Sequence, residues 1–152
     1  MKRNVIISLA DSNYFELLNE LINSIKRFKQ SHEVAICVLD AGLSQKEVEI
    51  LKNKVDEIKK AEWDIEVPGS KIRGKEWLKS QVSRAFIPNY FPNYKKYLWI
   101  DCDAWVQEWS AIELYFKACD KGKLGITQTM APGYKIMSKV KWLFGKLAVI
   151  KS

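Results

Sequence analysis

Short apolar runs alternate with amphipathic stretches along this chain, and this alternation constrains the fold more than any other feature. Runs rich in β-branched residues occupy 5–10 and 34–39, and apolar residues at helical spacing follow each of them. Further strands are predicted at 63–67, 97–100 and 124–127, and helices at about 17–28, 44–58, 75–86, 111–121 and 137–150. Such alternation is typical of a mostly parallel sheet covered by helices on both faces. We therefore predict an α/β, Rossmann-like fold.

Local signals support some of these boundaries. Ser44 and Glu47 have the spacing of a capping box, in which each side chain satisfies a free amide at the start of a helix. Pro88 and Pro92 are expected to end the helix at 75–86, because proline clashes with the preceding helical turn.

The net charge of +7 is concentrated in the last part of the chain. Residues 117–152 contain eight lysines and one acidic residue, Asp120, whereas residues 1–116 are balanced. This difference predicts a core over 1–116 and a basic extension of the same domain over 117–152. A neutral core argues against a nucleic-acid-binding domain.

The chain has the character of a cytoplasmic protein. No apolar run approaches the roughly 20 residues of a membrane-spanning helix, and the run that ends before Asp11 is too short for a signal peptide. Three cysteines without paired spacing favour neither a disulfide framework nor a zinc site. Residues 134–151 mix lysines with aromatic residues, which predicts a helix that either contacts an anionic membrane surface or packs on the sheet.

Ligands of parallel sheets bind beyond the carboxyl ends of the strands, which here directs attention to 11–14, 40–42 and 101–103. Asp101 and Asp103 follow a predicted buried strand, one residue apart. Carboxylate oxygens are favoured ligands of Mg²⁺ and Mn²⁺, which often bridge to substrate phosphates. A metal–diphosphate site is one interpretation of this pair, and a turn stabilised by hydrogen bonds from nearby backbone amides is the other.

Residues 11–14 also allow two interpretations. Asp11 could accept a hydrogen bond from a nucleotide base while Tyr14 stacks on it. Alternatively, Asp11 is the N-cap of the following helix and Tyr14 belongs to the core.

Taken together, the chain resembles the first part of a retaining glycosyltransferase with the GT-A fold. The similarity is to the family that holds bacterial lipopolysaccharide galactosyl- and glucosyltransferases and glycogenin. The resembling segments agree in order and spacing, and they are 10–14, 39–44, Ser83-Arg84 and 97–106. The resemblance covers about residues 4–116, which it makes a nucleotide-sugar-binding core.

The resemblance implies a role for each matched residue. Asp11 would accept a hydrogen bond from the uracil of a UDP-sugar, Tyr14 would stack on that base, and Arg84 would reach the donor sugar and diphosphate as the catalytic residue. Asp101 and Asp103 would hold Mn²⁺ or Mg²⁺. The residues implied in UDP-sugar binding are Ala10, Asp11, Asn13, Tyr14, Arg84 and Cys102. The acceptor would be a glycan or a lipid-linked glycan.

The chain also departs from this family, whose catalytic domains are longer and supply a third metal ligand, typically a histidine, from their second half. The one histidine here, His32, precedes the second predicted strand and cannot take that place. We therefore expect a glycosyltransferase that lacks its acceptor-binding half or, alternatively, a non-catalytic nucleotide-sugar-binding or interaction module.

Two other folds with related motifs are disfavoured. In haloacid-dehalogenase phosphatases the DxD pair follows the first strand and precedes Thr, whereas here Ala104 and Trp105 follow Asp103. A dinucleotide-binding domain needs G-x-G-x-x-G after the first strand, and residues 11–14 contain no glycine.

Overall fold

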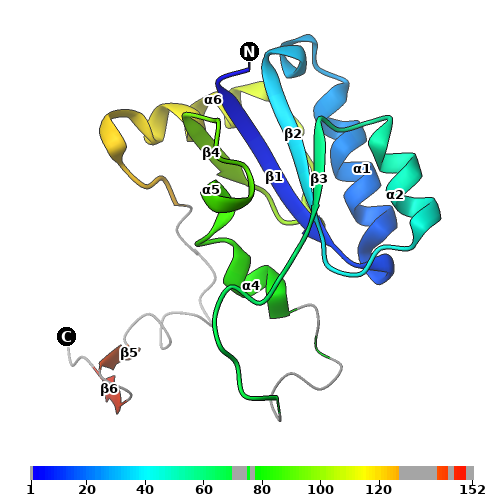
Figure 1. Cartoon of the computed structure of the whole chain (residues 1–152). Helices are drawn as coiled ribbons and strands as arrows, with labels where there is room; N and C mark the ends of the chain where they lie inside the picture. Colours follow the sequence, from blue (N-terminus) through cyan, green and yellow to red (C-terminus); the bar gives the residue numbers. More distant parts are fainter. Residues whose placement is uncertain (1, 70–74, 76–77, 127–139, 144–145, 150–152) are drawn as a thin grey trace.

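A four-stranded parallel sheet forms the centre of the molecule (Figure 1). The structure, a computed structural model, describes residues 2–69, 75, 78–126, 140–143 and 146–149, the last two ranges by their backbone alone. The strands lie in the order β3-β2-β1-β4. Their bounds are β1 Asn4–Ala10, β2 Val34–Asp40, β3 Glu57–Lys60 and β4 Lys96–Trp99. The predicted parallel α/β fold is therefore confirmed.

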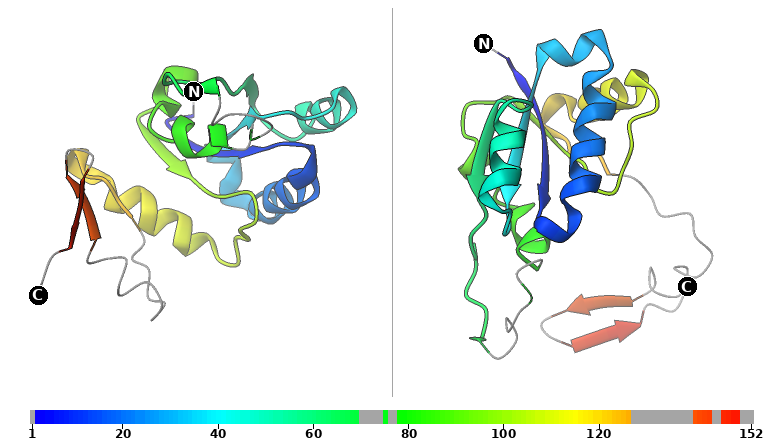
Figure 2. Two further views of the ribbon diagram at one scale, coloured as in Figure 1. Left: turned by 90° about the horizontal axis from the view of Figure 1, so that it is seen from below. Right: turned by 90° about the vertical axis from the view of Figure 1, so that its right-hand side faces the viewer.

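Helices cover the sheet on both faces, as predicted. The helices are α1 Phe15–Lys26, α2 Gln45–Lys52, α4 Lys79–Ser83, α5 Ile87–Tyr90 and α6 Trp109–Ala118, with short 3₁₀ turns η1 Ser12–Tyr14, η2 Lys29–Glu33 and η4 Asp120–Gly122. Helices α1 and α6 lie on one side of the sheet, and α5 lies on the other (Figure 2).

Alternate side chains of the central strands belong to two separate hydrophobic cores, one on each face of the sheet. Ile6 of β1 packs with Leu18 and Ile22 of α1 and Ile112 of α6 on the first face. Ile7 of β1 packs with residues that include Ile87, Phe91 and the buried thiol of Cys37 on the second face. Because β1 and β2 are buried on both faces, they read in the sequence as continuous apolar runs.

The capping box at the start of α2 is confirmed. The Ser44 side chain accepts a hydrogen bond from the Glu47 amide, and the Glu47 carboxylate accepts one from the Ser44 amide at 2.7 Å. Helix α2 ends at Lys52, however, not at residue 58 as predicted.

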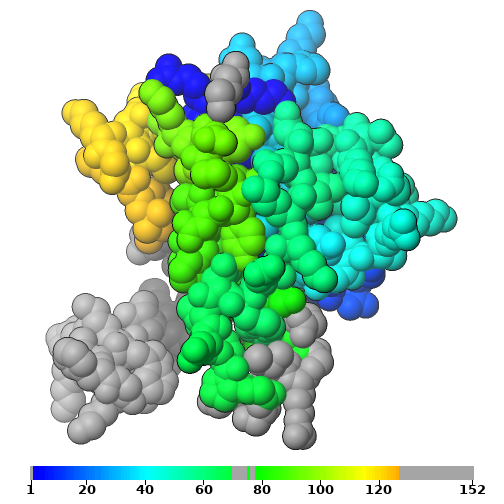
Figure 3. All heavy atoms as spheres, viewed as in Figure 1, coloured from blue at the N-terminus to red at the C-terminus, as the bar shows by residue number. Residues whose placement is uncertain are grey.

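The third strand was predicted six residues too late. Asp56 exchanges hydrogen bonds with the backbone of Ile36, which aligns β3 beside β2 from residue 57 onward. Ala61 makes the last of these contacts, to the carbonyl of Asp40. Residues 62–69 then leave the sheet beyond its carboxyl edge (Figure 1) and project from the body of the molecule (Figure 3).

Two further boundaries differ from the prediction. Pro88 does not end a helix but lies in the first turn of α5, where its missing amide has no helical partner to lose. Leu124 and Ile126 belong to no strand and are exposed, so the strand predicted at 124–127 is wrong over 124–126, while residue 127 lies outside the described residues.

The helix predicted at 137–150 is also wrong where the structure describes this segment. Strands β5 Val140–Leu143 and β6 Lys146–Val149 pair antiparallel, with Trp142 opposite Leu147. Lysine and apolar residues at this spacing fit either period, and the sequence signal for two strands was Gly145 between two runs of strand-forming residues. The remaining residues of that prediction lie outside the described part.

The described residues 140–143 and 146–149 therefore give no helical basis for the predicted membrane contact. Within the described residues, no helix combines the length and the hydropathy needed to cross a membrane.

Candidate functional site

A cavity of about 450 Å³ opens at the carboxyl ends of β1 and β4. These strands are parallel neighbours, with Ile7 opposite Trp99, so the loops that follow them meet at one edge of the sheet. Helix α5, which lies between β3 and β4 in the chain, covers the opposite face of the sheet from α1. The connections therefore change face between β1 and β4, and ligands of such sheets bind beside the strand ends at this point.

All eight residues that the sequence singled out line this cavity. They are Ala10, Asp11, Asn13, Tyr14, Arg84, Asp101, Cys102 and Asp103. The sequence reasoning missed Leu9, Ser80, Gln81 and Trp99, which also line it. Ser80 and Gln81 precede Arg84 by four and three residues, so the helical period could have placed them on its face.

Asp11 holds the loop after β1 in shape. Its Oδ1 atom accepts hydrogen bonds from the amides of Asn13 at 3.0 Å and Tyr14 at 3.3 Å, and its Oδ2 accepts one from the Asn13 side chain at 3.1 Å. Asp11 is thus the N-cap of η1 and also lines the cavity. Tyr14 is 48% exposed, so the interpretation of this residue as core is wrong.

The loop after β2 supports the site without lining the cavity. Asp40 accepts hydrogen bonds from the amides of Gly42 at 2.8 Å and Leu43 at 2.6 Å. Gly42 has φ +134°, a conformation that L residues rarely adopt, and its carbonyl accepts the Ser12 amide at 3.2 Å. Of the three segments indicated by the strand ends, 40–42 therefore supports 11–14.

A polar network connects the loop after β1 to the start of α2. The Ser12 hydroxyl lies 2.6 Å from the Glu47 carboxylate and accepts the Ser44 amide at 3.1 Å. The hydroxyl of Ser12 and the amide of Ser44 lower the pKa of Glu47 below its ordinary value. Glu47 therefore stays ionised to a lower pH than an unpaired glutamate.

On the β4 side, Arg84 and Asp101 form an ion pair. An Nη2 donor of Arg84 lies 2.6 Å from Asp101 Oδ1, and the Trp99 indole donates to the same oxygen at 2.9 Å. The guanidinium carbon of Arg84 also lies 5.1 Å from the centre of the Trp99 ring. Arg84 thus reaches the acidic pair directly.

Negative charge gathers around Cys102. Burial raises the pKa of its thiol, and the charges of Asp103, Asp101 and Asp11 raise it further. Cys102 is consequently a neutral thiol at physiological pH, surrounded by carboxylates from both sides of the cavity. Such a concentration of anionic oxygen favours a bound cation.

Asp101 and Asp103 could provide two ligands to that cation. In the described part of the chain, no three His, Cys, Asp or Glu side chains are grouped to hold a metal ion by themselves. Two carboxylates nevertheless fit a hard divalent ion whose remaining ligands are phosphate oxygens and water. His32 lies in η2, before β2, and does not line the cavity.

The segment after Asp103 is clamped to α1. Arg27 donates hydrogen bonds to the carbonyls of Val106 and Gln107, each at 2.7 Å, and the Ser24 hydroxyl accepts the Val106 amide at 3.0 Å. These contacts fix the downstream end of the acidic loop to a helix that is itself part of the core.

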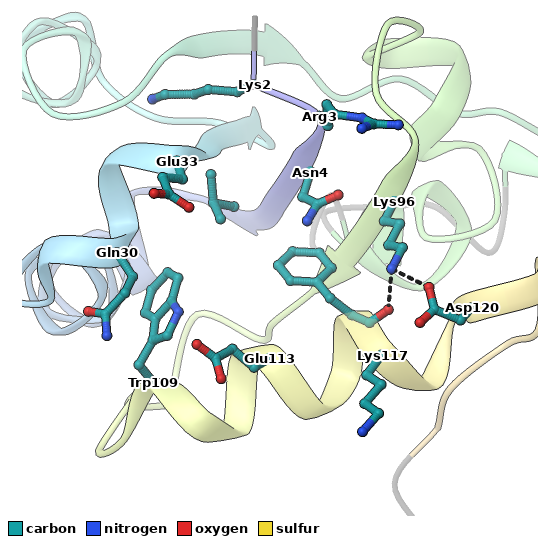
Figure 4. A pocket seen from close by; sticks show the side chains of 12 residues that line it. Lys2, Arg3, Asn4, Gln30, Glu33, Lys96, Trp109, Glu113, Lys117 and Asp120 are labelled. Atoms are coloured by element: carbon teal, nitrogen blue, oxygen red, sulfur yellow. Dashed lines mark hydrogen bonds and ion pairs between the residues drawn. The ribbon is translucent and has the colours of Figure 1, made fainter.

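A larger cavity, of about 700 Å³, lies at the opposite edge of the sheet (Figure 4). Lys96 there donates to the Phe116 carbonyl at 2.9 Å and pairs with Asp120, while Glu33 and Glu113 face it from other elements. Its size exceeds that of the first cavity, but it lies at the amino ends of the strands, and three acidic side chains offset most of the charge of its four cationic ones. The cavity of about 450 Å³ at the carboxyl ends of β1 and β4 is therefore the better candidate.

Comparisons with known proteins identify a family and a related fold. The family model described as Glycosyl transferase family 8 matches residues 5–118. Among solved structures, the chain is similar to that of an active-site mutant of LgtC, with a TM-score of 0.52 and 23% sequence identity. This match covers 73% of the present chain and 41% of the LgtC chain. No curated protein matches the chain. The structural likeness confirms the expected GT-A type of fold.

Proposed function

Because the chain belongs to glycosyl transferase family 8, we propose that the cavity between β1 and β4 binds a UDP-sugar together with a divalent cation. The reaction proposed is transfer of a hexose, with retention of configuration, to a glycan or a lipid-linked acceptor. The observation that carries the proposal is the convergence of all eight sequence-predicted residues on one cavity. A cytoplasmic location also remains a prediction.

Each side of the cavity has its own part in this proposal. The exposed ring of Tyr14 stacks on the uracil, while Asp11, fixed by its loop, accepts a hydrogen bond from the base. Ala10 and Asn13 line the nucleotide pocket beside them. Cys102, between Asp101 and Asp103 in the sequence, lines the cavity as an uncharged thiol. Arg84 donates to the diphosphate or donor sugar from the end of α4.

Asp101 and Asp103 are the proposed ligands of Mn²⁺ or Mg²⁺. A bound ion of this kind would act as a Lewis acid and neutralise the charge that develops on the diphosphate leaving group. The positive charge of Arg84 stabilises the same leaving group from the protein.

The alternative, a nucleotide-sugar-binding module without turnover, uses the same cavity. The chain spans 41% of the LgtC chain, so the activity of a whole enzyme is a proposal for it. Release of UDP from UDP-glucose, UDP-galactose and their N-acetyl forms, measured with a glycan acceptor extract, separates the two functions.

Calorimetric titration with UDP, with Mn²⁺ and with a chelator, tests the proposed site. We expect binding to be about a hundredfold tighter with Mn²⁺, since the ion links two carboxylates to the diphosphate and each contributes about tenfold. Equal affinity under both conditions would contradict the metal assignment. No binding under either condition would contradict the site itself.

Replacing Tyr14 with alanine is expected to weaken UDP binding by about 1–3 kcal/mol, the usual contribution of one base stacked on an aromatic ring. Tyr14→Phe keeps the ring and is the matched control, so its affinity should equal that of the parent. Calorimetry with UDP and ADP measures both effects. An alanine variant with parental affinity, or a parent that binds UDP and ADP equally, would show that Tyr14 and Asp11 do not select the base.

A further inference from the structure

Within the proposed function, we infer that Trp99 is a positioning residue for the acidic pair. Trp99 is the last residue of β4, and its indole Nε1 donates a hydrogen bond to Asp101 Oδ1 at 2.9 Å. It also lines the cavity. Trp99 holds no metal itself, and its role is to set the orientation of Asp101, one of the proposed ligands.

The orientation of the indole is set by the core. Side chains alternate along a strand, so Trp99 lies on the same face as Tyr97, and both pack against the core that contains Ile87 and Phe91. The ring is therefore anchored on one side by apolar contacts, while its N–H reaches the loop after the strand. A donor held in this way has little freedom to leave Asp101.

Trp99 also holds Arg84, the second group that contacts the same oxygen. The guanidinium carbon lies 5.1 Å from the centre of the ring, and an Nη2 donor lies 2.6 Å from Asp101 Oδ1. Indole, guanidinium and carboxylate thus form a closed set of three contacts. Helix α4 ends at Ser83 with Arg84 as its C-cap, and strand β4 ends at Trp99, so the ring joins two elements that meet at the cavity.

The ion pair alone gives Asp101 little fixed orientation. The Arg84 and Asp101 side chains are 39% and 54% exposed, and pairs that open to water contribute little in general. The partly buried indole is the rigid member of the three. Two donors that converge on Oδ1 direct that oxygen toward the protein, and we assign the other oxygen, Oδ2, to the cation.

The test compares Trp99→Phe with Trp105→Phe. Phenylalanine at 99 keeps an aromatic ring beside Arg84 and removes only the N–H donor. Trp105 is the control because it is half exposed, is not among the residues that line this cavity, and has its ring 5.7 Å from the guanidinium carbon of Arg27. Hydrogen-bond partners of metal ligands commonly contribute 10–100-fold to metal affinity. We therefore expect Trp99→Phe to weaken UDP binding about tenfold with Mn²⁺ and to leave binding in chelator unchanged, while Trp105→Phe changes neither.

A merely structural role for Trp99 predicts a different result. Equal losses with Mn²⁺ and with chelator would mean that the whole cavity is disturbed, and this would overturn the inference, as would parental affinity with Mn²⁺. Trp99→His, measured at pH 8, restores a ring N–H and should bind more tightly than Trp99→Phe. If the histidine variant is as weak as the phenylalanine variant, the donor is not the cause.

An NMR measurement on the parent protein tests the inference without any variant that would have to fold. Paramagnetic Mn²⁺ should broaden the indole N–H resonance of Trp99 at lower concentrations than the other indole resonances. An unbroadened Trp99 signal in a protein that binds UDP with Mn²⁺ would overturn the inference and leave the proposed function standing. A parent without Mn²⁺-dependent UDP binding would overturn the proposed function and, with it, this role of Trp99.

Discussion

Replacing Asp101 and Asp103 together with asparagine is expected to lower the Mn²⁺-dependent affinity for UDP by roughly a hundredfold. Each change turns an anionic oxygen ligand into a neutral amide of nearly the same shape, and hard divalent ions depend on the charge of their ligands. A loss of at least about tenfold per carboxylate is the basis of this figure. Calorimetric titration with UDP in Mn²⁺ measures it.

The controls separate ligand loss from other effects. Glu113→Gln removes an exposed carboxylate on α6 at the opposite edge of the sheet and should leave UDP binding unchanged. Asp103→Asn alone is informative because Asp101 then keeps its contacts with Arg84 and Trp99. If the double variant binds UDP with Mn²⁺ as tightly as the parent, the acidic pair does not hold the metal.

Replacing Phe91 with alanine is expected to reduce the free energy of unfolding by about 3–5 kcal/mol. Phe91 is 0% exposed and is among the largest fully buried side chains of the molecule. It lies directly after α5, where its ring fills the core between this helix and the sheet. Alanine would leave a cavity there, because the Tyr97 hydroxyl, bonded to the Phe91 carbonyl at 2.8 Å, holds the backbone in place.

Urea unfolding followed by circular dichroism measures this loss. Leu114→Ala is the control, since Leu114 is an exposed leucine on α6 and should change the free energy of unfolding by no more than about 0.5 kcal/mol. A Phe91→Ala loss below about 1 kcal/mol would show that this face of the sheet is loosely packed.

The elements that could be predicted are those whose apolar residues follow one pattern, either a continuous strand-length run or a helical spacing. Strands β1 and β2 read as continuous apolar runs because they are central and buried on both faces. β3 was missed because it is a partly exposed edge strand, and Ile58 also continues the helical spacing of Val48, Leu51 and Val55. Periodicity cannot decide between strand and helix when so few apolar residues are present.

The gathering of the candidate site residues in one cavity could be predicted better than the bounds of the elements around them. Asp11 and Asp101 follow strands whose ends were placed within one residue, and the topology of parallel sheets brings such ends together. The contact between Trp99 and Asp101 could not be predicted, because the sequence does not tell which side chains meet after a strand ends. The same holds for Arg84, whose bond to Asp101 depends on where α4 packs.

Asp11 has a consequence for how this loop can evolve. The same carboxylate closes the first turn after β1 and lines the cavity. Under the proposed function, a substitution of Asp11 that changes base recognition would also remove the cap of η1, and a substitution selected for stability would also alter base recognition. The two properties would then be inherited together at Asp11, and a change of nucleotide preference would be more accessible through Tyr14, whose side chain makes no capping hydrogen bond.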